Sequence, residues 1–264
     1  MMKDTFFSFS RFVNVCRKDV AENWKTYMLR LAMWYGVLAV VLVWNGFYVY
    51  RYGWQDINFG PFVFMFGLWG FGLLGASYTM EKMKSKTGRL STLMLPATPF
   101  EKFFSRWFVF TVVFLVAYLF AFRMADCTKA LIYSAIYPEN ASVGVTPLAR
   151  LFEGDVYNRK NPEFQGVLIA AYFFFQSCFV LGSSIWPKNS FIKTVAASVV
   201  IFVSYFLIVG FVVKYVVSGH LSAFSDISQE TVINILYVVV TTFTLLNWVL
   251  AYYRFKESEI INRM

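Results

Sequence analysis

Long apolar runs alternate with short polar segments along most of the 264-residue chain. An α-helix rises about 1.5 Å per residue and needs roughly 20 apolar residues to cross the hydrocarbon of a bilayer. The runs are evenly apolar and lack the alternation of barrel strands. The pattern therefore predicts an all-α, polytopic membrane protein with six transmembrane helices. The runs without Asp, Glu, Lys, Arg or His are Leu31 to Tyr50, Phe62 to Met80, Trp107 to Phe122, Phe164 to Trp186, Thr194 to Val213 and Val232 to Tyr253.

The third run has only 16 residues. We expect Phe103 and Phe104 to extend this span to about residues 103–122, and the side chains of Arg106 and Arg123 to reach opposite membrane interfaces. The rest of the chain then divides around the spans as one transmembrane domain covering residues 1–264. Its main connecting segments are residues 81–102 on one side and the long loop 123–163 on the other, where Ala130 to Tyr137 could prolong the third helix.

Residues 1–30 carry an amphipathic pattern ahead of the first span. At 100° per residue, the apolar side chains form one stripe, and charged side chains including Arg11, Lys18 and Lys25 lie opposite. This pattern predicts an interfacial helix along the membrane surface that bends into the first span near Arg30. Its role is either that of an ordinary membrane anchor or a functional one. The stripe contains Phe6, Phe9, Phe12, Val13, Cys16, Val20, Trp24 and Tyr27.

Basic side chains are distributed unevenly between the two sides. Of the 24 Lys and Arg residues, 17 lie in segments that six spans place on one side, which accounts for most of the net charge of +9. The positive-inside tendency makes that side the cytosol, so both termini are expected there. Because the basic residues are dispersed around helix ends, we expect anionic lipid headgroups and no nucleic acid as partners. The segments are residues 1–30, 81–106, 187–193 and 254–264.

A GxGxxG sequence occurs at Gly70 to Gly75, but it lies in the middle of the second predicted span. The dinucleotide-binding fingerprint needs a preceding strand and a later acidic residue. Small residues in a membrane helix more commonly allow a neighbouring helix to approach closely. We therefore assign helix packing to Gly67, Gly72, Gly75 and Ala76.

The chain offers little for catalysis. Its three cysteines are scattered, its one histidine, His220, lies in a predicted outer loop, and the six apolar runs contain no Asp, Glu, Lys, Arg or His. We expect no catalytic, cofactor or metal site and no enzymatic activity in this chain. Polar residues within the spans can form hydrogen bonds between helices or line a path for a substrate. They are Asn45, Gln176, Ser177, Ser204 and Asn247.

The segment between the second and third spans, residues 81–102, is more elaborate than a connector requires. Thr98 and Glu101 have the spacing of a capping box, with Pro99 at the first helical position. Upstream, residues 88–95 predict a short helix whose Leu90, Leu93 and Met94 form an apolar face. Such a helix is too short to be stable alone, so the face either docks on a partner or packs on the lipid surface.

Glu81, Gly88, the run Leu93 to Thr98, Glu101–Lys102 and Arg106 resemble the cytosolic signature of type 2 ABC export permeases from bacteria. That family shares the amphipathic amino-terminal helix, six spans and cytosolic termini. The resemblance implies that the segment contains a cytosolic coupling helix, which sits in a cleft of a separate ATPase subunit. It makes the following residues candidates for ATPase docking: Glu81, Gly88, Arg89, Leu90, Leu93, Met94, Leu95, Pro96 and Glu101.

The resemblance further implies a complex in the bacterial cytoplasmic membrane. Two copies of this chain, or this chain and a related permease, would bind two ABC ATPase subunits, which hold ATP and Mg²⁺ while this chain binds no cofactor. The expected function is the membrane-spanning permease subunit of an ATP-driven exporter. The alternative is a non-transporting membrane scaffold or assembly factor that recruits a cytosolic partner through the same segment.

Overall fold

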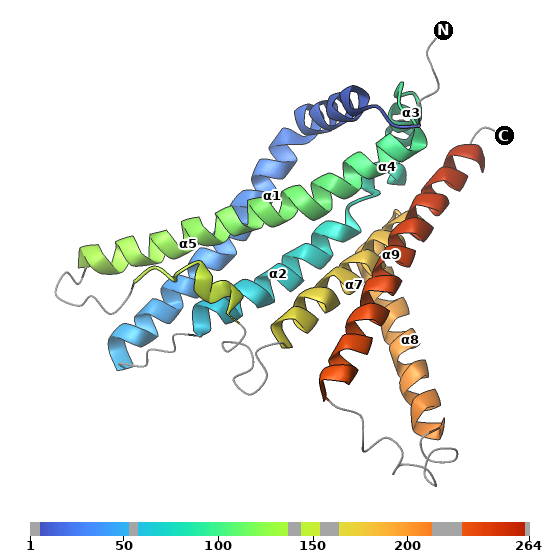
Figure 1. Cartoon of the computed structure of the whole chain (residues 1–264). Helices are drawn as coiled ribbons and strands as arrows, with labels where there is room; N and C mark the ends of the chain where they lie inside the picture. The colour runs from blue at the N-terminus through green and yellow to red at the C-terminus, as the bar shows by residue number, and fades with distance from the viewer. Residues whose placement is uncertain (1–5, 53–57, 137–143, 154–163, 213–228, 262–264) are drawn as a thin grey trace. The chain divides into compact units, whose positions relative to one another are not determined.

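The computed structural model describes residues 6–52, 58–136, 144–153, 164–212 and 229–261, and every regular element among them is helical (Figure 1). Five helices in the described part of the chain are long and apolar enough to cross a membrane, in keeping with a multi-pass membrane protein. The elements are α1 (Phe9–Tyr52), α2 (Phe59–Ser77), η1 (Glu81–Lys84), α3 (Lys86–Leu93), α4 (Pro99–Phe108), η2 (Val109–Val113), α5 (Phe114–Ile136), η3 (Ala149–Phe152), α7 (Phe164–Ile185), α8 (Ser190–Val212) and α9 (Gln229–Ile261).

The chain divides into two compact units. The first unit contains residues Met1–Ala76 and Ser91–Gly166, and the second contains Ser77–Leu90 and Val167–Met264. The chain thus leaves the first unit directly after α2 and returns to it within α3. The segment between the second and third predicted spans is therefore shared between the two units.

In the first unit, α1 and α5 run in the same direction. The ring of Trp34 lies 5.0 Å from that of Phe114, and further along both helices the hydroxyl of Tyr133 donates to the carbonyl of Val43 at 2.9 Å. Residue numbers rise together along the contact, as expected for the first and third crossings of a membrane.

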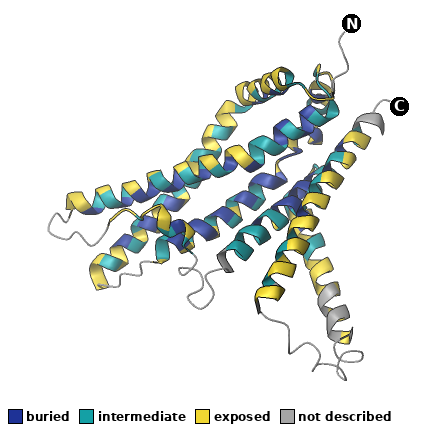
Figure 2. Ribbon diagram, in the orientation of Figure 1, coloured by how far each residue is buried: buried dark blue, intermediate teal, exposed yellow. Residues whose placement is uncertain are grey.

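Helix α2 packs antiparallel to α1. Trp34 meets Phe71, with ring centroids 6.2 Å apart, whereas the later residue Leu38 approaches the earlier residue Gly67. The first three predicted spans therefore alternate in direction. Figure 2 shows α2 carrying mostly buried and half-buried residues, whereas α1 keeps many exposed ones.

Helix α1 joins the predicted interfacial segment to the first span without interruption. Figure 1 shows that its first part, in dark blue, runs in a different direction from the rest, in line with the bend expected between the two. Phe9 and Trp24 of the amphipathic stripe are exposed, whereas Phe12 is buried.

The third predicted span is longer than expected. A continuous helical segment of 38 residues runs from Pro99 to Ile136 through α4, η2 and α5, so the helix continues 14 residues beyond Phe122 into the predicted loop. The charges that suggested an end at residue 122 are accommodated by pairing. Lys129 Nζ lies 2.6 Å from Asp126 Oδ1, one turn away, and Arg123 donates to the carbonyl of Thr146.

The fifth predicted span coincides with α8, which has 23 residues. Among side chains that the structure describes, the apolar part of α8 is Ser190–Ser204, shorter than a full crossing. The remainder of the predicted span, with the outer loop that contains His220 and much of the loop 137–163, lies outside the described side chains. Five spans are therefore supported by length and composition, and the remaining one, the fifth predicted span, stays a prediction.

Candidate docking segment

Residues 81–102 form a short 3₁₀ helix, η1, followed by α3, a turn and the start of α4. We refer to residues 81–102 as the docking segment. Ser85 begins α3 as its N-cap: its backbone is extended, and its Oγ accepts a hydrogen bond from the N–H of Gly88 at 3.1 Å. An N-cap of this kind satisfies a backbone N–H that the first turn would otherwise leave unpaired. The Ser85–Gly88 stretch is thus a helix start.

Gly88 is required by a close contact inside the docking segment. A Cβ at this position would collide with the backbone carbonyl oxygen of Lys82 and would also crowd Ser85 Oγ. Glycine therefore lets α3 fold back closely on η1. The sequence resemblance made Gly88 a candidate for partner contact, but its observed role is internal packing.

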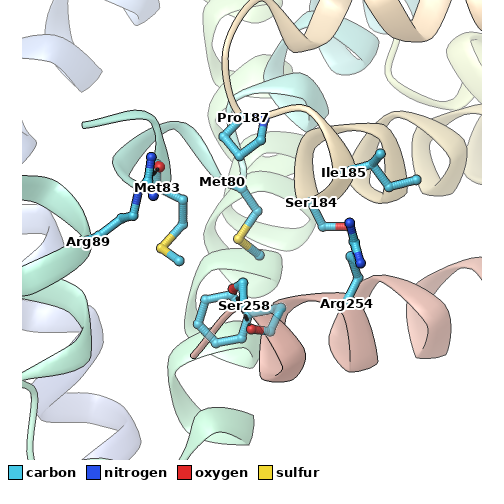
Figure 3. Close-up of a pocket in the computed structure, with 9 residues that line it drawn as sticks. Met80, Met83, Arg89, Ser184, Ile185, Pro187, Arg254 and Ser258 are labelled. Carbon is cyan, nitrogen blue, oxygen red and sulfur yellow. Dashed lines mark hydrogen bonds between the residues drawn. The ribbon is translucent and has the colours of Figure 1, made fainter. Parts of the chain in front are cut away.

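Arg89 also turns inward. Its Nε donates to the carbonyl of Met83 at 2.9 Å, and the side chain lines a cavity with Met80 and Met83 (Figure 3). The hydrogen bond ties the second turn of α3 to the end of η1. Arg89 is therefore a structural tie of the docking segment, and its guanidinium faces that cavity.

Two apolar side chains of the docking segment are exposed. Leu90 is 56% exposed and Met94 is 82% exposed, and Glu81 and Pro96 are exposed as well. Leu95 is half-buried. The side chain of Leu93 lies outside the described residues. Leu90 lies in the last turn of α3, and Met94 directly follows its last residue, Leu93.

Glu101 departs from the expected docking role because its side chain is 0% exposed. The predicted capping box is confirmed: the N–H of Glu101 donates to Thr98 Oγ1 at 3.3 Å, and the N–H of Thr98 donates to Glu101 Oε2 at 3.0 Å. The other carboxylate oxygen accepts from the N–H of Ser8 at 2.6 Å and from Arg11 Nη2 at 3.0 Å. These contacts fill the carboxylate, so Glu101 cannot face a partner in this conformation.

A second pair of charges joins α1 to α4. Arg106 Nη2 lies 3.7 Å from Asp19 Oδ1, and both residues are buried. Asp19 also accepts hydrogen bonds from the Tyr27 hydroxyl at 2.6 Å and from Asn23 Nδ2 at 3.2 Å. The Arg106 guanidinium thus faces Asp19, a residue of the predicted interfacial helix, and its place at a membrane interface stays a prediction.

Sequence reasoning missed the two ion pairs that join α4 to α1, one of which, Arg11–Glu101, involves the docking segment. The partners Arg11 and Glu101 are 90 positions apart, and the helical pattern placed Arg11 on a charged face opposite the apolar stripe. Opposite charge alone does not identify a partner at such a distance in sequence. The only available signal was that an isolated carboxylate or guanidinium is costly to bury and needs an opposite charge.

The small residues of α2 lie where other helices approach. A Cβ on Gly67 would collide with the hydroxyl of Tyr118 of α5, and one on Gly75 would lie 3.6 Å from the ring of Phe114. Ala76 and Gly72 are buried. This environment suits small side chains at all four positions.

Polar residues of the fourth and sixth predicted spans bond to one another within the second unit. Asn247 Nδ2 of α9 donates to Ser177 Oγ of α7 at 3.0 Å, and Trp248 Nε1 donates to Gln176 Oε1 at 3.3 Å. Gln176 and Ser177 are fully buried. Contact between helices is therefore the role that the structure gives these residues, whereas Ser204 bonds back to the carbonyl of Val200 in its own helix.

The part of the chain that the structure describes contains no group of three His, Cys, Asp or Glu side chains that could hold a metal ion. Comparisons of the chain with protein-family models, with curated proteins and with solved structures gave no match. The functional argument therefore rests on the docking segment: its internal contacts, its exposed side chains and the division of its residues between the two units.

Proposed function

We propose that this chain is the membrane-spanning permease subunit of an ATP-driven exporter and that the docking segment binds a separate ATPase subunit. The observation that carries the proposal is the division of the chain. Residues 77–90 belong to the second unit and the chain from Ser91 onward belongs to the first. A partner that holds α3 would therefore act on both units at once.

The internal ties of the docking segment support transmission of force. Ser85 and Gly88 fix α3 on η1, and Glu101 and Arg106 fix α4 on α1. Both ends of the docking segment are held by specific contacts. A displacement of α3 would therefore move the adjoining spans, whereas a flexible linker would absorb it. A motor subunit can drive such a change only if it binds two states of the segment with different free energies.

The exposed side chains supply the contact chemistry. Leu90 and Met94 offer apolar surface that a protein groove can bury, and exposed Lys84 and Lys86 flank it. We place the docking segment and both termini in the cytosol because 17 of the 24 basic residues lie on that side, and we take the cell to be bacterial from the resemblance to export permeases. A second copy of the chain, or a related permease, completes the proposed complex.

The direct test places a photo-crosslinking amino acid at position 90 of the full-length chain in its native membrane. The expected product is a crosslink to a cytosolic protein that binds and hydrolyses ATP. Leu90→Asp with Met94→Asp should abolish copurification of that ATPase, whereas Leu148→Asp should not. Leu148 is a matched control because it is also exposed but lies in the long predicted outer loop.

Two outcomes would overturn the exporter proposal. One is a crosslinked partner without nucleotide binding, which would favour the alternative of a scaffold or assembly factor. The other is an ATPase complex whose hydrolysis and copurification are unchanged when Leu90 and Met94 are both charged. Transport itself would be measured as ATP-dependent loss of cargo from cells that carry the chain and its ATPase.

A further inference from the structure

The second unit contains a cavity of about 320 Å³ where the end of α7, the later part of α9 and the start of the docking segment meet. Two arginines and two serines line it together with apolar side chains (Figure 3). In Figure 3, Met80 lies between Arg89 and Arg254, which approach from different elements. The lining residues are Met80, Met83, Arg89, Ser184, Ile185, Pro187, Arg254, Phe255 and Ser258.

The described wall of this cavity is positively charged. Arg89 and Arg254 line it, and none of the lining residues that the structure describes is acidic. Arg254 Nη1 lies 3.4 Å from Glu257 Oε2, but both side chains are about half exposed or more, and such a surface pair is weak. Arg89 uses Nε for the carbonyl of Met83, which leaves the two terminal nitrogens of its guanidinium to face the cavity. A ligand for this wall carries negative charge.

The remaining lining points to an amphiphile. Met80, Met83 and Phe255 are buried hydrophobic residues, and they form the apolar part of the cavity lining. Ser184 and Ser258 donate their hydroxyl protons to the carbonyls of Leu181 and Phe255 in their own helices, so their oxygens present lone pairs but no free proton. A small, fully hydrated anion would gain nothing from the apolar part of this lining.

The cavity also lies at the level where the fourth and sixth spans are predicted to leave the membrane. Ile185 is the last residue of α7, close to the predicted end of the fourth span at Trp186. Arg254 directly follows the sixth predicted span, which ends at Tyr253. Phospholipid headgroups occupy this level, and anionic lipids are attracted by basic residues at the cytosolic side.

We infer that this cavity binds one anionic phospholipid, with the phosphate between Arg89 and Arg254 and the upper acyl chain against Met80 and Phe255. The site does not depend on the proposed exporter function. Because Arg89 belongs to α3, a bound lipid would connect the docking segment to the ends of α7 and α9. Lipid composition would then influence how firmly the segment is held within the second unit.

Native mass spectrometry of the full-length chain in detergent tests the inference. The probes are phosphatidylglycerol and phosphatidylcholine with the same acyl chains, and the readout is the dissociation constant of the first bound lipid. We expect phosphatidylglycerol to bind more tightly. Arg89→Gln and Arg254→Gln should each weaken its binding about fivefold, since a basic residue near a lipid headgroup contributes about 1 kcal/mol.

Two further variants distinguish specific lipid binding in the cavity from nonspecific electrostatic attraction of the lipid to basic residues. Lys256→Gln removes the same charge from an exposed position of α9 that does not line the cavity, and we expect less than a twofold change. Ser258→Phe fills the cavity and keeps both arginines, and we expect it to weaken phosphatidylglycerol as much as the arginine variants. Thermal melting in the same detergent verifies that each variant is folded.

The inference is overturned if Lys256→Gln weakens binding as much as Arg254→Gln, or if Ser258→Phe and Arg254→Gln bind phosphatidylglycerol like the native chain. It is also overturned if millimolar inorganic phosphate displaces phosphatidylglycerol, because the site would then recognise a free anion. Should Arg89→Gln fail to fold after losing its tie to Met83, Arg254→Gln and Ser258→Phe still decide the question.

Discussion

Arg11 Nη2 lies 3.0 Å from Glu101 Oε1, and this contact joins the start of α1 to the first turn of α4. The carboxylate is fully buried, whereas the side chain of Arg11 is 23% exposed. Glu101 closes the capping box of α4 at the same time. The Glu101 side chain thus caps the helix that leads into the third span, and it also holds the start of α1.

Replacing Glu101 by Ala should destabilise the first unit by about 2–4 kcal/mol, because the change removes a helix cap worth about 1 kcal/mol and the ion pair with a partly buried arginine. Unfolding of the purified chain by denaturant in detergent measures the loss. Glu257→Ala is the matched control, since Glu257 forms an exposed pair with Arg254 and should cost less than about 1 kcal/mol. Equal effects of the two substitutions would contradict the anchoring role of Glu101.

How much of this arrangement the sequence predicts depends on the range of the interaction. The capping box of Thr98 and Glu101 is predictable because its two hydrogen bonds form between residues three positions apart. The bond from Arg11 is not, because helical periodicity identifies the charged face of residues 1–30 but not what that face meets. The pairing emerges only from the packing of α1 on α4.

The end of the third span illustrates a second limit. Arg123, Asp126 and Lys129 interrupt the apolar pattern, so hydropathy predicts an end near residue 122. The helix continues because Asp126 and Lys129 neutralise each other one turn apart, and Asp126 Oδ2 also accepts the N–H of Thr146 at 2.6 Å. A hydropathy window counts charges, but it does not register that they are paired.

The place of Gly88 within the docking segment leads to a functional prediction. Gly88→Ala should push α3 away from η1, because the added Cβ meets the fixed carbonyl oxygen of Lys82 rather than a flexible side chain. Overpacking of this kind costs about 1–3 kcal/mol. Under the exporter proposal, we expect the variant to remain in the membrane but to lose most of the ATPase copurification.

Gly36→Ala is the control for that substitution. A Cβ at Gly36 would meet nothing within 4 Å, and alanine is favoured over glycine within a helix by up to about 1 kcal/mol. The control variant should therefore be as stable as the native chain or slightly more so. Unchanged copurification in Gly88→Ala would show that the close contact between α3 and η1 is dispensable for docking.

The contact of Gly67 with Tyr118 predicts a coupled pair of substitutions in the membrane-spanning part. Gly67→Ala alone should cost about 1–3 kcal/mol because its Cβ collides with the Tyr118 hydroxyl. Tyr118→Phe alone removes the hydrogen bond to the carbonyl of Phe64 and should cost about 1 kcal/mol. Once that hydroxyl is absent, the nearest remaining neighbours of the Cβ lie at 3.4 Å, so the double variant should be more stable than the sum of the single effects predicts.

A double-mutant cycle in detergent measures this coupling, which we expect to be about 1 kcal/mol or more. Gly70→Ala serves as a control in the same helix, because a Cβ at Gly70 has nothing within 4 Å. Strict additivity of Gly67→Ala and Tyr118→Phe would mean that α2 and α5 are not held at the observed distance in the bilayer.

The alternation of the first three spans allows a test of orientation with a native side chain. Cys127 is exposed on α5, beyond the apolar part of the third span, and the excess of basic residues at the other end of that span predicts that Cys127 lies outside the cell. A membrane-impermeant maleimide should therefore label Cys127 in intact cells. In a variant with Cys127 replaced by Ser, a cysteine introduced at Ser85 should react only after permeabilisation, because Ser85 is exposed on the docking segment. The reverse labelling pattern would place the docking segment outside the cell, where no cytosolic ATPase could reach it.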